Sequence, residues 1–369
     1  MPFQRSFPRF PKQPGTYFIR GPRQIGKTTW LKSILSQEAK KQKSCFYLSC
    51  ENVFDFKELA TVLAQVKTTE VVILDEISFV RDWWRAVKHE LDKGSFNILI
   101  LSGSHTRDVR KGMDQMPGRW GEGQELLLLP MTFSEFSSMR KQANWPALKK
   151  LDELKLYFKI GGFPIALHES GPDGNVPEKA RQIVQRWLVG DILKLGKQEL
   201  YLKEIMLEIA KTQTSTLSLQ RLAQNTNLGS HHTAIDYVQI LEDCFALKSL
   251  YFLDPWKGKY QFKKEKKFYF RDPIFYWIAW QMTEMSPPEN FEEKIAEMTA
   301  HEHLSRKHER IGYYKSEKGE IDFVSPKPWA IEVKWAEVAK HVSRAFTELN
   351  MLEKTLWTQK NFLDDHSSD

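Results

Sequence analysis

The stretch Gly21-Pro-Arg-Gln-Ile-Gly-Lys-Thr28 decides the fold of the first part of this chain. The apolar segment 16–20 in front of it predicts a short strand, and residues 29–35 behind it predict a helix. Glycines in such a loop let backbone N–H groups turn inward, and the helix that follows adds the positive end of its dipole. A strand, a loop of this pattern and a helix together predict a P-loop, which holds the phosphates of a nucleoside triphosphate.

The positions of the loop differ in the roles that we expect for them. Lys27 is placed to reach the β- and γ-phosphates, and the Thr28 hydroxyl is placed to bind Mg²⁺. ATP and Mg²⁺ are therefore the expected cofactors of this part of the chain. The residues predicted to contact the nucleotide are Gly21, Pro22, Arg23, Gln24, Ile25, Gly26, Lys27, Thr28 and Thr29.

Length, charge and cysteine content limit the class of protein. A chain of 369 residues is long enough for several domains, and 54 Lys and Arg against 47 Asp and Glu give a modest net charge of +7. The cysteines, Cys45, Cys50 and Cys244, form no CxxC pair, which favours a reducing compartment. The sequence shows neither the apolar run of a signal peptide nor a segment apolar enough to span a bilayer. We expect a soluble cytoplasmic protein with no membrane partner.

The chain after the P-loop alternates apolar strands with amphipathic helices, which predicts a mainly parallel sheet covered by helices. Strands are expected at 44–48 and 71–74, and the second one ends in Asp75-Glu76. A buried strand that ends in two carboxylates after a P-loop is typical of a Walker B motif. In that motif Asp75 would hold Mg²⁺ through water, and Glu76 would polarise the water that attacks ATP.

Two further residues are candidates for the ATP site. Ser104 follows the strand expected at 97–101, where it would either sense the γ-phosphate or only cap the end of the strand. Arg119 follows a loop, where it would either act as an arginine finger in a neighbouring subunit or form part of the charged surface. The first interpretation of Arg119 implies a homo-oligomer.

The ordered set of motifs resembles a known family. The P-loop, Leu74-Asp-Glu-Ile77 and Ser102-Gly-Ser104 are similar to those of predicted bacterial and archaeal ATPases of the AAA+ superfamily. Leu129-Pro-Met-Thr-Phe-Ser-Glu-Phe136 and Gly161-Gly-Phe-Pro164 resemble the same family further along the chain. The resemblance implies a helical lid after the ATPase core, and a C-terminal domain similar to restriction endonucleases.

The middle of the chain has the pattern of a helix–turn–helix. Residues 218–224 predict a short helix, residues 225–229 predict a turn with glycine, and Ser230 caps a second helix that extends to about residue 243. In DNA-binding proteins the second helix of this motif lies in the major groove. The residues expected on its outward side for DNA contact are His231, His232 and Thr233.

A basic wing is expected directly after this second helix. Its strands are predicted at 246–252 and 260–262, and lysines cluster in and after the turn between them. Phosphate contact is the natural role for such a cluster, although winged helices in large ATPases also pack against other domains and charged runs are often only solvated. The lysines predicted to contact DNA are Lys257, Lys259, Lys263, Lys264, Lys266 and Lys267.

A second candidate active site lies near the C-terminus. Side chains alternate along a strand, so Glu332 and Lys334 of the strand expected at 330–334 project from the same face. Asp322 lies on the preceding strand, at 320–324. An acidic residue on one strand, followed on the next strand by an acidic residue and a lysine two positions later, resembles the motif of the PD-(D/E)XK nuclease fold. In that fold two carboxylates hold Mg²⁺ or Mn²⁺, and the lysine stabilises the attacking or developing charge.

The roles at this second site follow from that resemblance. Asp322 and Glu332 would bind the metal, Lys334 would assist catalysis, and the glutamate that the fold usually takes from a preceding helix is best matched by Glu297. The alternative is that these residues form only the charged faces of a small sheet. Retained residues also do not prove cleavage, because similar domains bind nucleic acids or proteins.

We therefore expect an α/β chain of four parts. Residues 1–130 form a P-loop ATPase core of AAA+ type, 131–196 a helical lid, 197–285 a winged helix and 286–369 a PD-(D/E)XK-like domain. The leading hypothesis is an ATPase that acts on DNA, in which ATP controls the winged helix and a metal-dependent nuclease. The alternative is a nucleotide-switched regulatory or scaffold protein whose nuclease-like domain is catalytically silent and binds a partner.

Overall fold

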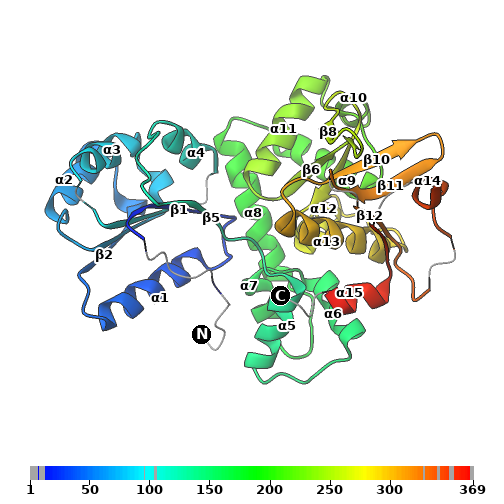
Figure 1. Cartoon of the computed structure of the whole chain (residues 1–369), viewed down its shortest axis with the longest axis horizontal. Helices are drawn as coiled ribbons and strands as arrows, with labels where there is room; N and C mark the ends of the chain where they lie inside the picture. The colour runs from blue at the N-terminus through cyan, green and yellow to red at the C-terminus, as the bar shows by residue number, and fades with distance from the viewer. Residues whose placement is uncertain are drawn as a thin grey trace. The chain divides into compact units, whose positions relative to one another are not determined.

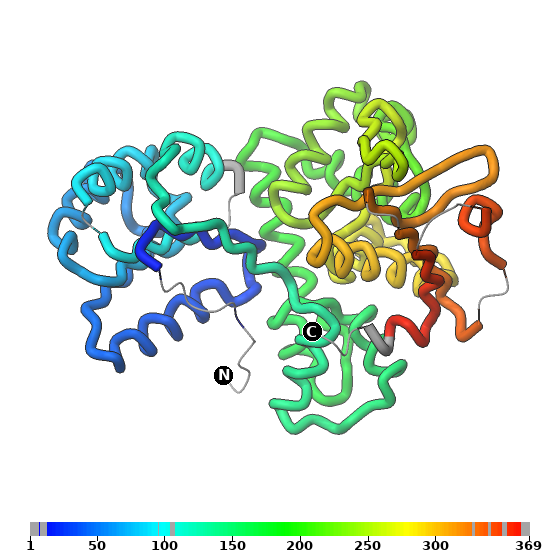
Figure 2. Tube along the Cα trace, viewed as in Figure 1, coloured from blue at the N-terminus to red at the C-terminus, as the bar shows by residue number. Residues whose placement is uncertain are grey.

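The structure is a computed structural model that describes residues 7, 13–94, 96–103, 106–326, 329–338, 341–348 and 353–365, with the backbone alone at 106–107 and 363–365. The chain divides into two compact units (Figures 1 and 2). The N-terminal unit comprises Ser6–Leu129, and the C-terminal unit comprises Pro130–Asp369 with Met1–Arg5.

A parallel sheet forms the centre of the N-terminal unit. Among the described residues its strand order is β2-β3-β4-β1-β5, and every neighbouring pair is parallel. The strands β3 and β4 are buried along their whole length, as their continuous aliphatic sequence requires in a sheet covered on both faces. The strands are β1 Gly15–Arg20, β2 Cys45–Ser49, β3 Val71–Asp75, β4 Ile98–Gly103 and β5 Glu125–Leu127.

Helices cover both faces of this sheet. Side chains of α2, α3 and α4 pack with Phe18, Leu74 and Leu101 in one apolar core, whereas α1 lies on the other face (Figure 1). The helices are α1 Lys27–Lys40, α2 Phe56–Gln65, α3 Trp84–Asp92 and α4 Thr106–Asp114, with short 3₁₀ turns η1 Cys50–Asn52 and η2 Ile77–Phe79. The predicted parallel α/β sheet with covering helices is confirmed.

The C-terminal unit begins with helices. Buried apolar faces on α6, α8, α9 and α12 form its centre, and α12 packs against each of the other three. The helices are α5 Phe133–Gln142, α6 Lys150–Ile160, α7 Pro164–Ser170, α8 Glu178–Lys194, α9 Glu199–Thr212, α10 Leu219–Gln224, α11 His231–Asp243, α12 Pro273–Gln281, α13 Phe291–Lys307, α14 Arg344–Glu348 and α15 Gln359–Asp365.

The strands of the C-terminal unit form separate small sheets. β6 (Leu247–Tyr251) pairs antiparallel with β9 (Lys266–Phe270), and β7 (Leu253–Asp254) pairs with β8 (Lys259–Tyr260). This differs from the predicted wing, in which the strand at 246–252 would pair with residues near 260. The reason is burial, because Phe268 and Phe270 of β9 are buried beside β6, whereas Phe262 is 64% exposed.

A mixed sheet completes the C-terminal unit. Its order is β10-β11-β12-β13, antiparallel except for the parallel pair β12–β13, and α13 packs against β12 and also against β9. Helix α13 therefore connects this sheet to the β6–β9 pair. The strands are β10 Gly312–Ser316, β11 Gly319–Val324, β12 Trp329–Val333 and β13 Glu353–Trp357.

The Gly161-Gly-Phe-Pro164 motif joins α6 to α7 against the start of α12. The Asp272 carboxylate caps α12 by accepting from Ile274 N (2.9 Å), and its other oxygen accepts from Gly162 N (2.7 Å). A Cβ on Gly162 would lie 2.2 Å from Met131 O, and one on Gly161 would lie 2.3 Å from the Asp272 carboxylate. Glycine is required at both positions because backbone and a capped carboxylate approach so closely.

We expect Gly162→Ala to destabilise the C-terminal unit by roughly 2–4 kcal/mol, because a backbone oxygen cannot yield as a flexible side chain would. Thermal unfolding measures this as a lower Tm. Gly190→Ala is the matched control: a Cβ there meets nothing within 4 Å inside α8, so alanine should leave the Tm unchanged or raise it slightly. Equal Tm values for both variants would contradict this account of the motif.

Candidate nucleotide site and C-terminal carboxylate cluster

The loop between β1 and α1 has the backbone that a phosphate cradle needs. Gln24 and Gly26 have φ of 64° and 96°, in the left-handed region, and α1 begins at Lys27. A Cβ on Gly21 would lie 1.9 Å from Leu128 O, so the start of the loop accepts only glycine. The predicted strand–loop–helix context of the P-loop is therefore present in the structure.

The Lys27 ammonium group lies inside this loop. Its Nζ donates to Gly21 O and to Pro22 O, both at 2.9 Å, and the side chain is buried. Burial lowers the pKa of Lys27, and the nearby carboxylates of Glu76 and Asp75 oppose that effect. Neutral backbone carbonyls therefore hold the Lys27 ammonium group. They belong to the same loop that would surround a phosphate.

Asp75 lies where the ends of several parallel strands meet. Its Oδ2 accepts from Thr28 Oγ1 (2.7 Å) and from the Tyr47 hydroxyl (2.9 Å), and its Oδ1 accepts from the Ser102 hydroxyl. The predicted Mg²⁺ residues Thr28 and Asp75 are therefore in direct contact. A hydroxyl and a carboxylate are oxygen donors of the kind that Mg²⁺ prefers, so the residues present fit the ion.

Glu76 adopts a left-handed backbone conformation with φ of 53°. Its N–H donates to Asp75 Oδ1 (3.1 Å) and to Ser102 Oγ (3.2 Å), which hold the residue in this uncommon conformation. Ser102 therefore orients both acidic residues of the predicted Walker B motif. Ser104, the residue predicted from the sequence for this position, lies outside the described residues, and neither Ser102 nor Tyr47 was predicted. A serine within the buried aliphatic run of β4 was the available signal for Ser102.

Arg119 is engaged within its own unit. Its Nε donates to Asp92 Oδ1 (2.6 Å) and its Nη2 to Asp92 Oδ2 (3.3 Å), while Nη1 donates to Pro117 O. The hydrogen bonds from Arg119 lower the pKa of the Asp92 carboxyl. A finger role in a neighbouring subunit stays a prediction, and it would require Arg119 to exchange Asp92 for a phosphate.

We expect Ser102→Ala to lower both the rate of ATP hydrolysis and the affinity of the protein for Mg²⁺ by roughly 10–100-fold. The reason is that Asp75 and Glu76 lose the hydroxyl group that orients both of them. Steady-state hydrolysis over a range of Mg²⁺ concentrations measures both. Ser33→Ala is the control, since its hydroxyl only donates to Trp30 O within α1. Unchanged kcat and Mg²⁺ dependence in the Ser102 variant would refute its positioning role.

Two short helices, α10 and α11, occupy the segment in which a helix–turn–helix is predicted. Ser230 Oγ accepts from Thr233 N (3.2 Å) and caps α11, whose inner side buries Ala234 and Tyr237. His231 and His232 are exposed, with ring centroids 4.0 Å apart, and Thr233 is half-buried. The start of α11 therefore presents polar side chains at the surface of its unit.

The predicted basic cluster divides into surface and buried members. The exposed members are Lys257, Lys259, Lys263 and Lys264. Lys266 is half-buried, and its Nζ donates a hydrogen bond to Phe262 O. Lys267 was predicted to contact DNA, and this prediction is wrong because its side chain is fully buried. Adjacent residues of a strand project from opposite faces, so β9 directs Lys267 inward.

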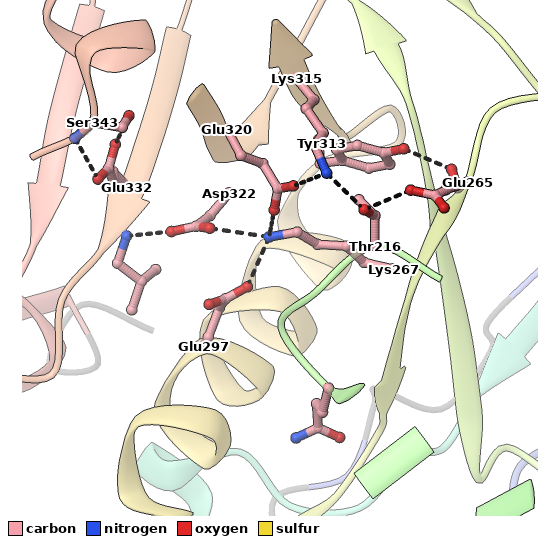
Figure 3. A network of polar contacts seen from close by, with 12 residues as sticks. Thr216, Glu265, Lys267, Glu297, Tyr313, Lys315, Glu320, Asp322, Glu332 and Ser343 are labelled. Carbon is pink, nitrogen blue, oxygen red and sulfur yellow. Dashed lines mark hydrogen bonds and ion pairs between the residues drawn. The ribbon is translucent and has the colours of Figure 1, made fainter. Parts of the chain in front are cut away.

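The buried Lys267 ammonium lies among carboxylates (Figure 3). Its Nζ is 3.1 Å from Glu297 Oε1 of α13, 2.8 Å from Glu320 Oε1 of β11 and 3.0 Å from Asp322 Oδ1 of β11. Burial alone would lower the pKa of Lys267, but these carboxylates raise it well above its usual value. The lysine is therefore charged, and its charge is balanced within the cluster.

The pKa of the Glu297 carboxyl is shifted upward by its surroundings. Burial, helped by the charge of Asp322, raises its pKa to about 7, against the opposing effects of Lys267 and of a 2.5 Å hydrogen bond from the Tyr269 hydroxyl. Glu297 thus takes up a proton near neutral pH in the folded chain.

The predicted metal ligands Asp322 and Glu332 have different partners. The second oxygen of Asp322 accepts from Val333 N (2.9 Å). Glu332, which is 2% exposed, accepts from Ser343 N (3.0 Å) and Ser343 Oγ (2.7 Å) and pairs with Lys334 Nζ (3.1 Å). Figure 3 shows the Glu332 carboxylate directed toward Ser343 and that of Asp322 toward Lys267.

A divalent metal does not fit these residues as they lie. Both oxygens of Asp322 and both of Glu332 already accept hydrogen bonds or pair with lysine, and the Lys267 ammonium stands among the acidic groups. Within the part of the chain that the structure describes, no group of three or more His, Cys, Asp and Glu is arranged to hold a metal ion. The nuclease roles of Glu297, Asp322, Glu332 and Lys334 therefore stay predictions that this geometry does not favour.

Two buried carboxyls should contribute stability that falls as pH rises from about 5 to 7. The folded pKa of Glu297 is about 7 against an ordinary 4.5, and burial raises that of Asp272 to about 7 against 3.8. These two groups bind more protons in the folded state than in the unfolded state and lose stability as the protons leave, whereas buried His301, whose pKa burial lowers well below its usual value, contributes the opposite trend. We expect Glu297→Gln to flatten the dependence of Tm on pH, whereas the exposed Glu309→Gln leaves it unchanged. Identical pH profiles for both variants would refute the assignment.

Comparisons with known proteins agree with the geometry of the N-terminal unit. Residues 13–137 match the family model described as an AAA domain, and residues 151–280 match a domain of unknown function (DUF8612). The Walker-type ATPase of Pyrococcus abyssi superposes with a TM-score of 0.50 at 11% identity, over 72% of this chain and 90% of that one. The N-terminal unit is therefore a P-loop ATPase domain of AAA type.

Sequence similarity beyond the family models is distant. An uncharacterized protein of Methanocaldococcus jannaschii is 24% identical over 254 residues, which cover 62% of this chain and 55% of the relative. The chain thus spans about half the length of this curated relative. Among the described residues, no helix has both the length and the apolar character needed to cross a membrane.

Proposed function

We propose that this chain is an ATPase that acts on DNA, with the nucleotide state of the N-terminal unit controlling how the C-terminal unit engages a duplex. The observation that carries the proposal is the helix–turn–helix of α10 and α11, whose second helix begins with exposed polar side chains. In proteins that read DNA, the start of this helix contacts base edges in the major groove.

The segment after α11 supports the proposal with charge. Lys257, Lys259, Lys263 and Lys264 are exposed in and after the β7–β8 hairpin, where they are available to phosphates. Trp256 and Phe262, in the same segment, are 59% and 64% exposed. Lysines that bind phosphate beside aromatic rings on which bases stack are a combination found in nucleic-acid-binding surfaces.

A second candidate function is a nucleotide-switched scaffold, and the Lys267 cluster favours it for the C-terminal domain. Lys267 already neutralises the carboxylates that a metal ion would need for phosphodiester cleavage. Metal-dependent cleavage is therefore not part of our proposal. Both functions need ATP, whose phosphates Lys27 would contact, and Mg²⁺, which Thr28 and Asp75 would hold and which would neutralise phosphate charge. They differ in whether the winged helix binds DNA or a protein.

Charge reversal at the exposed lysines tests DNA binding. We expect Lys263→Glu with Lys264→Glu to weaken binding to linear, branched or single-stranded DNA by roughly tenfold or more and to reduce its salt dependence, because phosphate contacts are lost. Fluorescence anisotropy at several salt concentrations measures both quantities. The exposed Lys149→Glu with Lys179→Glu, outside the winged helix, is the matched control.

The coupling to ATP needs its own measurement. DNA should change the ATPase rate of the wild-type chain, and Lys27→Ala should abolish hydrolysis. If the wild-type protein neither binds DNA at low salt nor changes its ATPase rate when DNA is added, the scaffold function replaces the DNA proposal.

A further inference from the structure

Lys267 belongs to one part of the C-terminal unit and its partners to another. The residue lies on β9, which pairs with β6 of the winged-helix segment. Its Nζ reaches Glu297 on α13 and both Glu320 and Asp322 on β11, which belong to the domain with the mixed sheet. A buried ammonium without such partners would cost several kcal/mol, so the lysine and the carboxylates depend on one another.

The same carboxylates are the groups that a divalent cation would use. Asp322 on β11 is a predicted metal ligand, Glu297 on α13 is the predicted catalytic glutamate of the same site, and oxygen donors from carboxylates suit Mg²⁺ and Mn²⁺. The Lys267 nitrogen lies 2.8 to 3.1 Å from one oxygen of each acid. It therefore supplies positive charge at the point on which these oxygens converge.

Surrounding hydrogen bonds extend the cluster into a network (Figure 3). Lys315 Nζ pairs with the second oxygen of Glu320 (3.4 Å) and donates to Thr216 Oγ1 (2.9 Å), which in turn donates to Glu265 (2.8 Å). The Tyr313 hydroxyl donates to Glu265 O (2.6 Å). The winged-helix segment and the mixed sheet are thus fastened to each other by polar contacts around the lysine.

We infer that Lys267 is a built-in cation that closes the C-terminal carboxylate site to divalent metals and fastens the mixed sheet to the winged helix. The domain resembling a nuclease then serves as a rigid extension of the winged helix rather than as a hydrolytic centre. Removing the ammonium group opens the acidic cluster to a metal ion. This inference does not depend on whether the winged helix binds DNA.

Mn²⁺ binding in the absence of nucleotide tests the inference. Mn²⁺ binding to the full chain is measured by isothermal titration calorimetry. Each protein is measured once with Asp322 and once with the added substitution Asp322→Asn. Binding that the added substitution abolishes is assigned to the C-terminal site. We expect no such site in the wild-type chain or in Lys266→Ala, the control on the same strand. Lys267→Ala should gain an Asp322-dependent Mn²⁺ site that both the wild-type chain and Lys266→Ala lack.

Stability provides a second readout. Lys267→Ala should have a lower Tm than Lys266→Ala in EDTA, because buried carboxylates lose their counter-ion, and Mn²⁺ should recover part of the loss only while Asp322 is present. If Lys267→Ala does not fold, Lys267→Gln is used in its place and compared with Lys266→Ala. Glutamine retains most of the side-chain volume and two hydrogen-bond donors but lacks the positive charge.

Two results would overturn the inference. The first is an Asp322-dependent Mn²⁺ site in the wild-type chain, or Mn²⁺-dependent DNA cleavage by the wild-type chain that Glu332→Ala abolishes. The second is a folded Lys267 variant that gains no Asp322-dependent Mn²⁺ site. Either would mean that the lysine does not stand in for a metal ion.

Discussion

The contact of the Lys267 ammonium with the carboxylates of Glu297, Glu320 and Asp322 governs the architecture of the C-terminal unit. The Lys267 side chain is fully buried and Glu297 is nearly so, whereas Glu320 and Asp322 are half-buried, so the ammonium above all would carry a large desolvation cost without the carboxylates. The strand β9, the helix α13 and the strand β11 must therefore assemble together. A hydrophobic core tolerates small shifts between elements, whereas this arrangement fixes their register through directed contacts of about 3 Å.

Two buried lysines, Lys27 and Lys267, have opposite surroundings. Lys27 is held by the neutral carbonyls of Gly21 and Pro22, so its charge is left to attract a phosphate, and burial lowers its pKa. Lys267 is held by carboxylates, so its charge is already balanced, and its pKa is raised. The first arrangement suits binding of an anion, and the second suits a permanent internal link.

The sequence predicts those features whose causes lie within a short window. The P-loop, the Asp75-Glu76 strand end and the Ser230 cap depend on neighbouring residues, and the structure has all of them. Lys267 could not be placed in this way. Lys267 is the last residue of a lysine-rich segment, and such a segment predicts exposed side chains. The carboxylates that contact it, such as those of Glu297 and Asp322, lie on elements distant in the sequence. The apolar run 268–270 directly after it was the local signal that a buried strand begins there.

Local sequence rules account for only part of the carboxylate site. Strand alternation predicts that Glu332 and Lys334 project together, and their 3.1 Å ion pair agrees with this. Alternation cannot predict that Ser343 binds both oxygens of Glu332, because Ser343 lies beyond the strand. A motif fixes which residues lie on one face of a sheet, whereas the chemistry of a site depends on what else reaches that face. At this site Lys267 contacts Asp322 and Ser343 contacts Glu332, so both carboxylates already have partners within the chain.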